Sequence, residues 1–191
     1  FDACLITPQI TWGTSPEQVV GIDEKIPVVN PTTTPEAQAG IQRSFEYMSV
    51  ESGQALEGMP IEAAFIGSCT NSRLVDLEAA AKILKGHKVS EKVTAICTPG
   101  SESVKKAAED KGIDKIFKDA GFEWREPGCS LCMSGGAGGE TFDPKSRIVS
   151  STNRNFENRQ GQGVRSHLCS PAMVAYSAIC GKISDPRKFE D

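Results

Sequence analysis

The pattern of apolar and polar positions predicts short buried strands that alternate with helices. Residues 61–67 and 93–97 are apolar runs of strand length, residues 147–150 form a third, and residues 122–124 a shorter one. Continuous apolar runs are typical of parallel strands that are covered on both faces. The pattern therefore predicts an α/β domain of three layers, with a largely parallel sheet flanked by helices.

Capping residues and helical spacing predict the helices between these strands. A helix is expected over 34–48, because Thr34 can cap its amino end and Pro35 fits the first turn. A second should begin at Leu74 and end at Gly86, since glycine commonly follows the last helical residue. Three further helices are expected over 101–111, 114–120 and 171–180.

The amino-terminal part has a different composition. Residues 1–33 are rich in Pro, Thr and Gly and predict a loop-rich lead-in with short extended pieces. The length of 191 residues fits a single domain over 1–191. The chain starts without Met and reaches apolar residues at once, so we expect it to be a fragment of a larger enzyme.

Charge and cysteine usage exclude several classes of protein. Lys+Arg 21 against Asp+Glu 25 gives a net charge of −4, and the absence of a basic run argues against nucleic acid as a partner. No apolar stretch approaches the ~18 residues that a membrane span needs. Seven cysteines, an odd number, are scattered through a chain too large to depend on disulfides, so we expect a reducing compartment, the cytoplasm.

Three of the cysteines could form a metal site. Cys69 lies in FIGSCTNS (65–72), just beyond a predicted strand, where ligands of parallel sheets bind. Cys129 and Cys132 lie in PGCSLC (127–132). The residues alone leave four alternatives: unligated thiols, a redox pair, a zinc site, or an iron–sulfur cluster with one iron that lacks a protein ligand.

The zinc alternative would need His87 or His167 as the fourth ligand. His87 is expected to face solvent at a helix end, and His167 to be a packed or capping residue. The cluster alternative has a chemical use, because an open position on iron acts as a Lewis acid on a substrate oxygen.

A second group of candidate residues lies in STNRNFENRQG (151–161). This stretch is too rich in Asn and Gly for a stable helix, so a loop could direct both Arg154 and Arg159 inward. Guanidinium groups bind carboxylates through two parallel hydrogen bonds. The alternative is that both arginines are solvated or pair with Glu157.

The glycine cluster at 135–139 could be mistaken for a nucleotide-binding loop. It lacks a preceding strand, a following Lys-Ser/Thr and the G-x-G-x-x-G register. We interpret it as flexible backbone beside a site.

Four motifs together resemble the aconitase superfamily in their order and separation: GSCTNSR (67–73), PGCSLC (127–132), NRNFENR (153–159) and SHLCSPAM (166–173). TWGT (11–14) and GFEWR (121–125) also fit. Within the superfamily, PGCSLC is more similar to the isopropylmalate dehydratases, large subunit or large-subunit portion. Aconitases and homoaconitases usually carry Cys-Gly-Pro-Cys there.

The resemblance implies roles for individual residues. Cys69, Cys129 and Cys132 would be the three ligands of a [4Fe–4S] cluster, one per full enzyme. Asn153, Arg154 and Arg159 would be substrate-binding residues, with Asn153 near the cluster and the arginines on a carboxylate. Cys4, Cys97, Cys169 and Cys180 match no ligand motif and are interpreted as core or incidental thiols.

The resemblance also implies a function. The chain would be the third, cluster-binding domain of a hydro-lyase that isomerises 2-isopropylmalate to 3-isopropylmalate by dehydration and rehydration in leucine biosynthesis. It would need the preceding domains and a small subunit or fused swivelling domain, so we expect the isolated chain to be inactive. We also expect it to lack the cluster as purified, because exposed thiolates and an open iron are easily oxidised. The alternatives are a homoaconitase or aconitase-type hydratase domain and a non-catalytic metal- or RNA-binding module.

Overall fold

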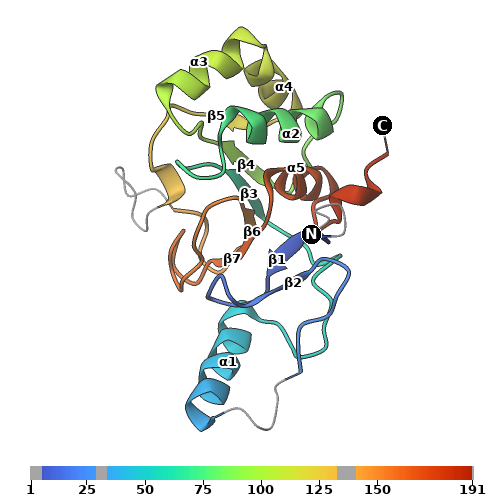
Figure 1. Ribbon diagram of the computed structural model, residues 1–191, viewed down its shortest axis with the longest axis vertical. Coiled ribbons are helices and arrows are strands. Elements are labelled where there is room, and N and C mark those ends of the chain that lie inside the picture. Colours follow the sequence, from blue (N-terminus) through green and yellow to red (C-terminus); the bar gives the residue numbers. More distant parts are fainter. Residues whose placement is uncertain (1–5, 29–33, 133–140, 191) are drawn as a thin grey trace.

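A five-stranded sheet lies at the centre of the structure, a computed structural model that describes residues 6–28, 34–132 and 141–190. The strand order is β5-β4-β3-β6-β7, and every neighbouring pair is parallel (Figure 1). The strands are β3 (Ala63–Ile66), β4 (Thr94–Cys97), β5 (Glu123–Trp124), β6 (Arg147–Ser150) and β7 (Arg165–Leu168). The predicted α/β class with a parallel sheet flanked by helices is confirmed, and four predicted strands are found within their expected ranges.

The order of the strands defines where a ligand can bind. From β3 the chain proceeds outward to β4 and β5, and then returns to the other side of β3 to form β6 and β7. A crevice forms at such a reversal, at the carboxyl ends of the strands. The loops that follow β3 and β6 therefore meet at the predicted position of a site.

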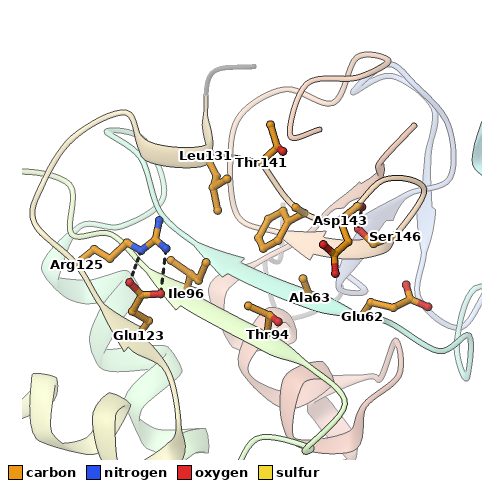
Figure 2. A pocket seen from close by; sticks show the side chains of 11 residues that line it. Glu62, Ala63, Thr94, Ile96, Glu123, Arg125, Leu131, Thr141, Asp143 and Ser146 are labelled. Carbon is orange, nitrogen blue, oxygen red and sulfur yellow. Dashed lines mark hydrogen bonds and ion pairs between the residues drawn. The ribbon is translucent and has the colours of Figure 1, made fainter. Parts of the chain in front are cut away.

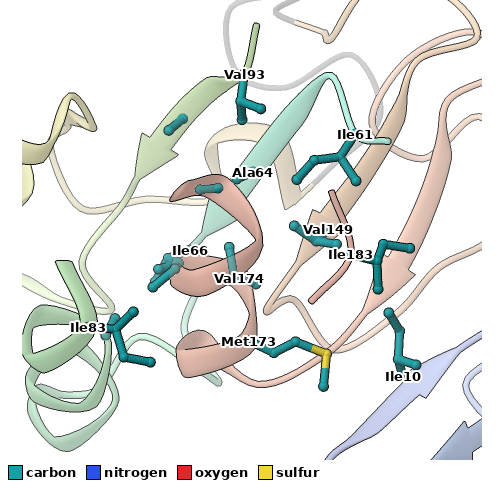
Figure 3. Close-up of a cluster of buried hydrophobic side chains, with 14 of the residues drawn as sticks. Ile10, Ile61, Ala64, Ile66, Ile83, Val93, Val149, Met173, Val174 and Ile183 are labelled. Carbon is teal, nitrogen blue, oxygen red and sulfur yellow. The ribbon is translucent and has the colours of Figure 1, made fainter. Parts of the chain in front are cut away.

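Helices α2 (Leu74–Leu84) and α5 (Pro171–Cys180) pack together on one face of the sheet. Helix α5 contacts β3, β6 and its neighbour α2. Val174 of α5 and Ile83 of α2 belong to one core cluster with Ile66 of β3 (Figure 3). Helices α3 (Glu102–Asp110) and α4 (Ile113–Ala120) connect β4 to β5, and the 3-10 turn η3 (Pro186–Lys188) follows α5.

Loop residues cover the opposite face of the sheet. Phe65 and Ile148 point to this face and form a second cluster with Leu131, Phe142 and Val164, which lie outside the α-helices and strands. This cluster ties the segment around Leu131 to the sheet, which matters for the site below. Within the described ranges, every helix is too short or too polar to cross a membrane.

The amino-terminal part packs beside β7. The described residues 6–28 contain an antiparallel hairpin, β1 (Gln9–Thr11) and β2 (Val19–Gly21), where loops with extended pieces were expected. Helix α1 (Pro35–Met48) starts as predicted, because the Thr34 hydroxyl accepts a hydrogen bond from the Ala37 amide at 3.4 Å. Both β1 and α1 contact β7, a strand that the sequence did not predict.

A buried Arg–His pair joins this part to the sheet. Arg147 on β6 donates through Nη1 to His167 Nε2 on β7 at 2.7 Å and through Nη2 to the Met48 carbonyl at 2.8 Å. His167 Nδ1 lies 2.7 Å from the Thr11 carbonyl, so it must carry the proton and donate there. Burial, and then the charge of Arg147, lower the pKa of His167 from 6.5 to about 3.

His167 should make the fold sensitive to acid. Above about pH 6.5 the imidazole is neutral in both states and its contribution to stability is fully present. As the pH falls from 6.5 towards 3, His167 binds a proton in the unfolded chain but stays neutral in the folded chain. The free energy of unfolding should then drop by up to ~1.4 kcal/mol per pH unit.

Denaturant titrations from pH 7.5 to 4 measure this dependence. His167→Gln should lose stability at neutral pH and show a shallower decline in acid. The matched control, His87→Gln, leaves the Arg147–His167 pair in place and should keep the decline. Equal slopes for wild type and His167→Gln would refute the assignment.

Candidate metal and substrate site

The Cys69 loop leaves the end of β3 in a tightly constrained turn. A Cβ on Gly67 would lie 2.4 Å from Cζ of the buried Phe65 ring, so only glycine fits there. Ser68 follows with a φ of 72°, a left-handed conformation that is uncommon for serine. The turn brings the Cys69 side chain out of the core to an exposed position at the carboxyl edge of the sheet.

Cys129 directly precedes the 3-10 helix η2 (Ser130–Cys132), and Cys132 is its last residue. The Cys132 amide donates to the Cys129 carbonyl at 2.8 Å. Leu131 between them is 1% exposed and packs with Phe65 of β3 in the second core cluster. An apolar residue between the cysteines therefore anchors the turn, while Cys129 is exposed and Cys132 is half-buried.

Arg159 joins the arginine loop to this turn. Its Nε donates to the Cys132 carbonyl and its Nη2 to the Cys132 Sγ, both at 2.8 Å. Nη2 also donates to Asn153 Oδ1 at 3.3 Å. Arg159 is only 4% exposed, and its Nη1 is buried without a hydrogen-bond partner in the described structure. An unpaired buried donor on a guanidinium is costly, so this group is suited to an anionic ligand.

Arg154 is placed differently from Arg159. It is exposed, and its side chain has no hydrogen bond or ion pair to the residues that the structure describes. Glu157 pairs with Arg43 of α1 at 3.6 Å, so the alternative that Glu157 neutralises the two loop arginines is not what the structure shows. Arg154 remains available, and its role in substrate binding stays a prediction.

The arginine loop is held by residues that the sequence did not single out. Asn155 is 2% exposed and donates to the Gly13 carbonyl at 2.6 Å, which ties the loop to the TWGT motif. The Tyr47 hydroxyl accepts from the Asn158 amide at 2.7 Å and donates to the Val164 carbonyl at 2.9 Å. The loop contains no helix, as predicted. Its conformation is set by neighbours that are distant in the sequence.

Cysteine thiolates are the usual protein ligands of iron–sulfur clusters, so the residue type of Cys69, Cys129 and Cys132 fits such a cluster. Among residues 6–28, 34–132 and 141–190, no three His, Cys, Asp or Glu side chains are close enough to hold one metal ion. In a cluster each thiolate binds a different iron, so the sulfurs need not converge on a single point. Arg159 Nη1, buried without a partner in the described structure, would be a donor for the negative charge of such a group.

The histidines do not complete a zinc site. Both ring nitrogens of His167 are occupied by Arg147 and Thr11. His87 is half-buried, with Nδ1 3.2 Å from the Lys85 carbonyl and its ring edge-on to Phe189. Neither lies in a group of metal-ligating side chains in the described ranges.

Two of the remaining described cysteines, Cys97 and Cys169, behave as core thiols. Cys97 is fully buried in β4, and burial raises the pKa of its thiol well above the usual value. Burial also raises the pKa of Cys169. Both thiols stay protonated at neutral pH and are poor metal ligands. Cys4 and the glycine cluster at 135–139 lie outside the described residues.

A cavity of about 290 Å³ on the loop-covered face of the sheet is a separate feature (Figure 2). Arg125 reaches across its wall to Glu123, with Nε and Nη2 at 2.9 and 3.0 Å from the two carboxylate oxygens. Leu131 lines it, but none of the three cysteines or the three predicted substrate-binding residues does. The predicted site is instead an open surface at the sheet edge.

Comparison with known proteins agrees with the motifs and the fold. A model of the aconitase family (aconitate hydratase) matches residues 1–181, so the chain belongs to the aconitase family. It is 50% identical over 187 residues to the 3-isopropylmalate dehydratase large subunit of Cupriavidus necator. The matched region covers 98% of this chain and 69% of that protein. The chain is 51% identical over 190 residues to the 3-isopropylmalate dehydratase large subunit 1 of Bradyrhizobium diazoefficiens, across 100% of this chain and 39% of that protein.

Proposed function

We propose that this chain is the cluster-binding domain of a 3-isopropylmalate dehydratase large subunit. The complete enzyme would be a hydro-lyase of leucine biosynthesis that interconverts 2- and 3-isopropylmalate by removing and returning water. The observation that carries the proposal is the contact of Arg159 with Cys132, because it joins a carboxylate-binding group to a predicted cluster ligand. The names of the two relatives support the substrate.

Cys69, Cys129 and Cys132 would hold the [4Fe–4S] cluster. When bound, the cluster supplies a Lewis acid at the iron that has no protein ligand. The thiols of Cys69 and Cys129 are exposed, so the cluster would lie at the surface of this chain. The rest of the enzyme must then exclude water from the site.

The chain's own polar residues would bind and orient the substrate. Arg159 Nη1 would donate to one carboxylate, because its other nitrogens are already committed to Cys132 and Asn153. Asn153 Oδ1 accepts from Arg159, so the Asn153 amide nitrogen is left to donate to the substrate. Arg154 would supply a second guanidinium. A hydroxy dicarboxylic acid matches this set of donors.

The groups that move the proton would come from outside this chain. We infer that a small subunit or fused swivelling domain, together with the remaining large-subunit domains, completes the site. The chain covers 69% and 39% of the two relatives, which supports this division. The isolated chain should therefore show no turnover of either isopropylmalate.

The six described cysteines are free, which supports a reducing cytoplasmic location.

A chimaeric enzyme tests the proposal. This chain would replace the matching segment of the Cupriavidus necator large subunit, which would be loaded with iron and sulfide under anaerobic conditions and combined with its small subunit. We expect turnover of 2- and 3-isopropylmalate, measured by ultraviolet absorbance of the unsaturated intermediate. Preference for citrate or homocitrate would favour the aconitase-type alternatives. An inactive chimaera whose isolated domain shifts RNA in a gel would favour the non-catalytic alternative.

A further inference from the structure

Ser151, the first residue after β6, holds the Cys69 loop from the neighbouring strand. Its hydroxyl accepts a hydrogen bond from the Gly67 amide at 3.1 Å and donates to the Asn71 carbonyl at 3.1 Å. The Asn71 side chain returns a bond to the Ser151 carbonyl at 2.8 Å. These three hydrogen bonds fix the loop at Gly67 and Asn71, two residues before and two residues after Cys69.

Three residues after Cys69 the loop is also held by the buried Ser72, whose hydroxyl donates to the Thr98 carbonyl at 2.8 Å and whose carbonyl accepts from the Gly100 amide at 3.0 Å. The residues next to Cys69 are fixed less directly. Cys69 itself makes no hydrogen bond to the described residues and its side chain is exposed. Ser68 is buried in a left-handed conformation, and its hydroxyl has no partner in the described structure. The position of Cys69 therefore depends on the bonds that flank it. Ser151 is fully buried, so water cannot replace its hydroxyl without cost.

The segment that begins at Ser151 also reaches the second cysteine turn. Eight residues later, Arg159 donates to the carbonyl and sulfur of Cys132. Asn153 lies between the two contacts and bonds to Arg159. One short loop thus touches both cysteine-bearing segments and carries the predicted substrate ligands.

We propose that Ser151 is a positioning residue that fixes the position of Cys69 relative to Cys132, Asn153 and Arg159. The cluster ligands and the substrate-binding residues would then keep a constant relative geometry. This inference rests on the proposed function for the identity of the cluster. A hydroxyl is required because the side chain must accept from one backbone group and donate to another at the same time. Residues around a metal site that orient its ligands commonly control retention of the metal.

The neighbouring Ser150 provides a matched control. It is equally buried, but its hydroxyl bonds only within its own segment, to the Thr152 hydroxyl at 3.0 Å and the Thr152 amide at 3.3 Å. Ser150→Ala should lower stability to a similar degree as Ser151→Ala without releasing the Cys69 loop. Any difference between the two variants then reports on positioning and not on folding.

The first test uses the metal-free 191-residue chain. Hydrogen exchange of the Gly67 amide, measured by NMR, should be at least about tenfold faster in Ser151→Ala and unchanged in Ser150→Ala. Asn71→Asp replaces the amide that donates to the Ser151 carbonyl with an acceptor, at a less buried position. This variant should also accelerate exchange of the Gly67 amide. Unchanged Gly67 exchange in both Ser151→Ala and Asn71→Asp would overturn the proposal.

The second test uses the chain after anaerobic reconstitution with iron and sulfide. Ser151→Ala should lose its cluster to a chelator about 10- to 100-fold faster than Ser150→Ala, and Ser151→Thr should restore retention. Equal loss in the two alanine variants would overturn the proposal. If the wild type itself forms no cluster, the proposed function fails, while the exchange measurement still decides whether Ser151 positions the loop.

Discussion

Arg159→Lys should lower kcat/KM of the chimaeric enzyme by roughly 30- to 1,000-fold, because about 2–4 kcal/mol of transition-state stabilisation is lost. Lysine keeps the positive charge but lacks the planar fork of donors. Its donors all lie on one nitrogen, which cannot span the positions that Arg159 reaches through Nε, Nη2 and Nη1. The loss should therefore be seen even though the charge is unchanged.

Arg43→Lys is the matched control for this experiment. Arg43 is 77% exposed and pairs with Glu157 of the same loop at 3.6 Å, so it tests for general effects of arginine replacement near the site. Its kcat/KM should stay within about twofold of the wild type, since exposed ion pairs contribute little. Full activity of Arg159→Lys would show that the contact with Cys132 has no part in the reaction.

Arg147→Met should lower the free energy of unfolding by about 3–5 kcal/mol. Methionine preserves much of the apolar stem but leaves the His167 ring nitrogen and the Met48 carbonyl without their buried donor. Arg147 is 6% exposed, so water cannot take over these bonds. Its pKa is lowered to about 10, mainly by burial, and it remains charged at neutral pH.

Urea denaturation at pH 7.5 measures this effect, with Arg43→Met as the exposed control. The control should change the free energy of unfolding by less than about 0.5 kcal/mol. A loss of less than about 1 kcal/mol in Arg147→Met would mean that the buried Arg–His pair does not hold the amino-terminal part to the sheet.

The sequence predicted most of the sheet and the helices, because their signals are local. Apolar runs marked β3, β4 and β6, and the Ser101 and Ser170 hydroxyls cap the amino ends of α3 and α5. Strand β7 was missed because Arg165, Ser166 and His167 are polar. His167 is nevertheless fully buried, since its polar atoms pair with Arg147 and Thr11. Such compensation depends on residues far away in the sequence.

The site was predictable only in part for the same reason. Motifs identified Cys69 and Cys132, but no sequence pattern indicates that Ser151 bonds to the turn around Cys69. That contact exists because β3 and β6 are neighbours in the sheet although more than 80 residues separate them. The hydrogen bond of Arg159 to Cys132 likewise depends on the packing of Leu131 against Phe65, which places the cysteine turn against the sheet.

The most direct test of the central claim is the iron and acid-labile sulfide content of the chain after anaerobic reconstitution. The wild type should bind about four iron and four sulfide ions, and Cys69→Ser, Cys129→Ser and Cys132→Ser should each lose them to the same extent. Cys180→Ser, at a half-buried cysteine outside the motifs, should keep the cluster. Zinc in place of iron and sulfide, or a cluster that survives any of the three site substitutions, would contradict the three-cysteine assignment.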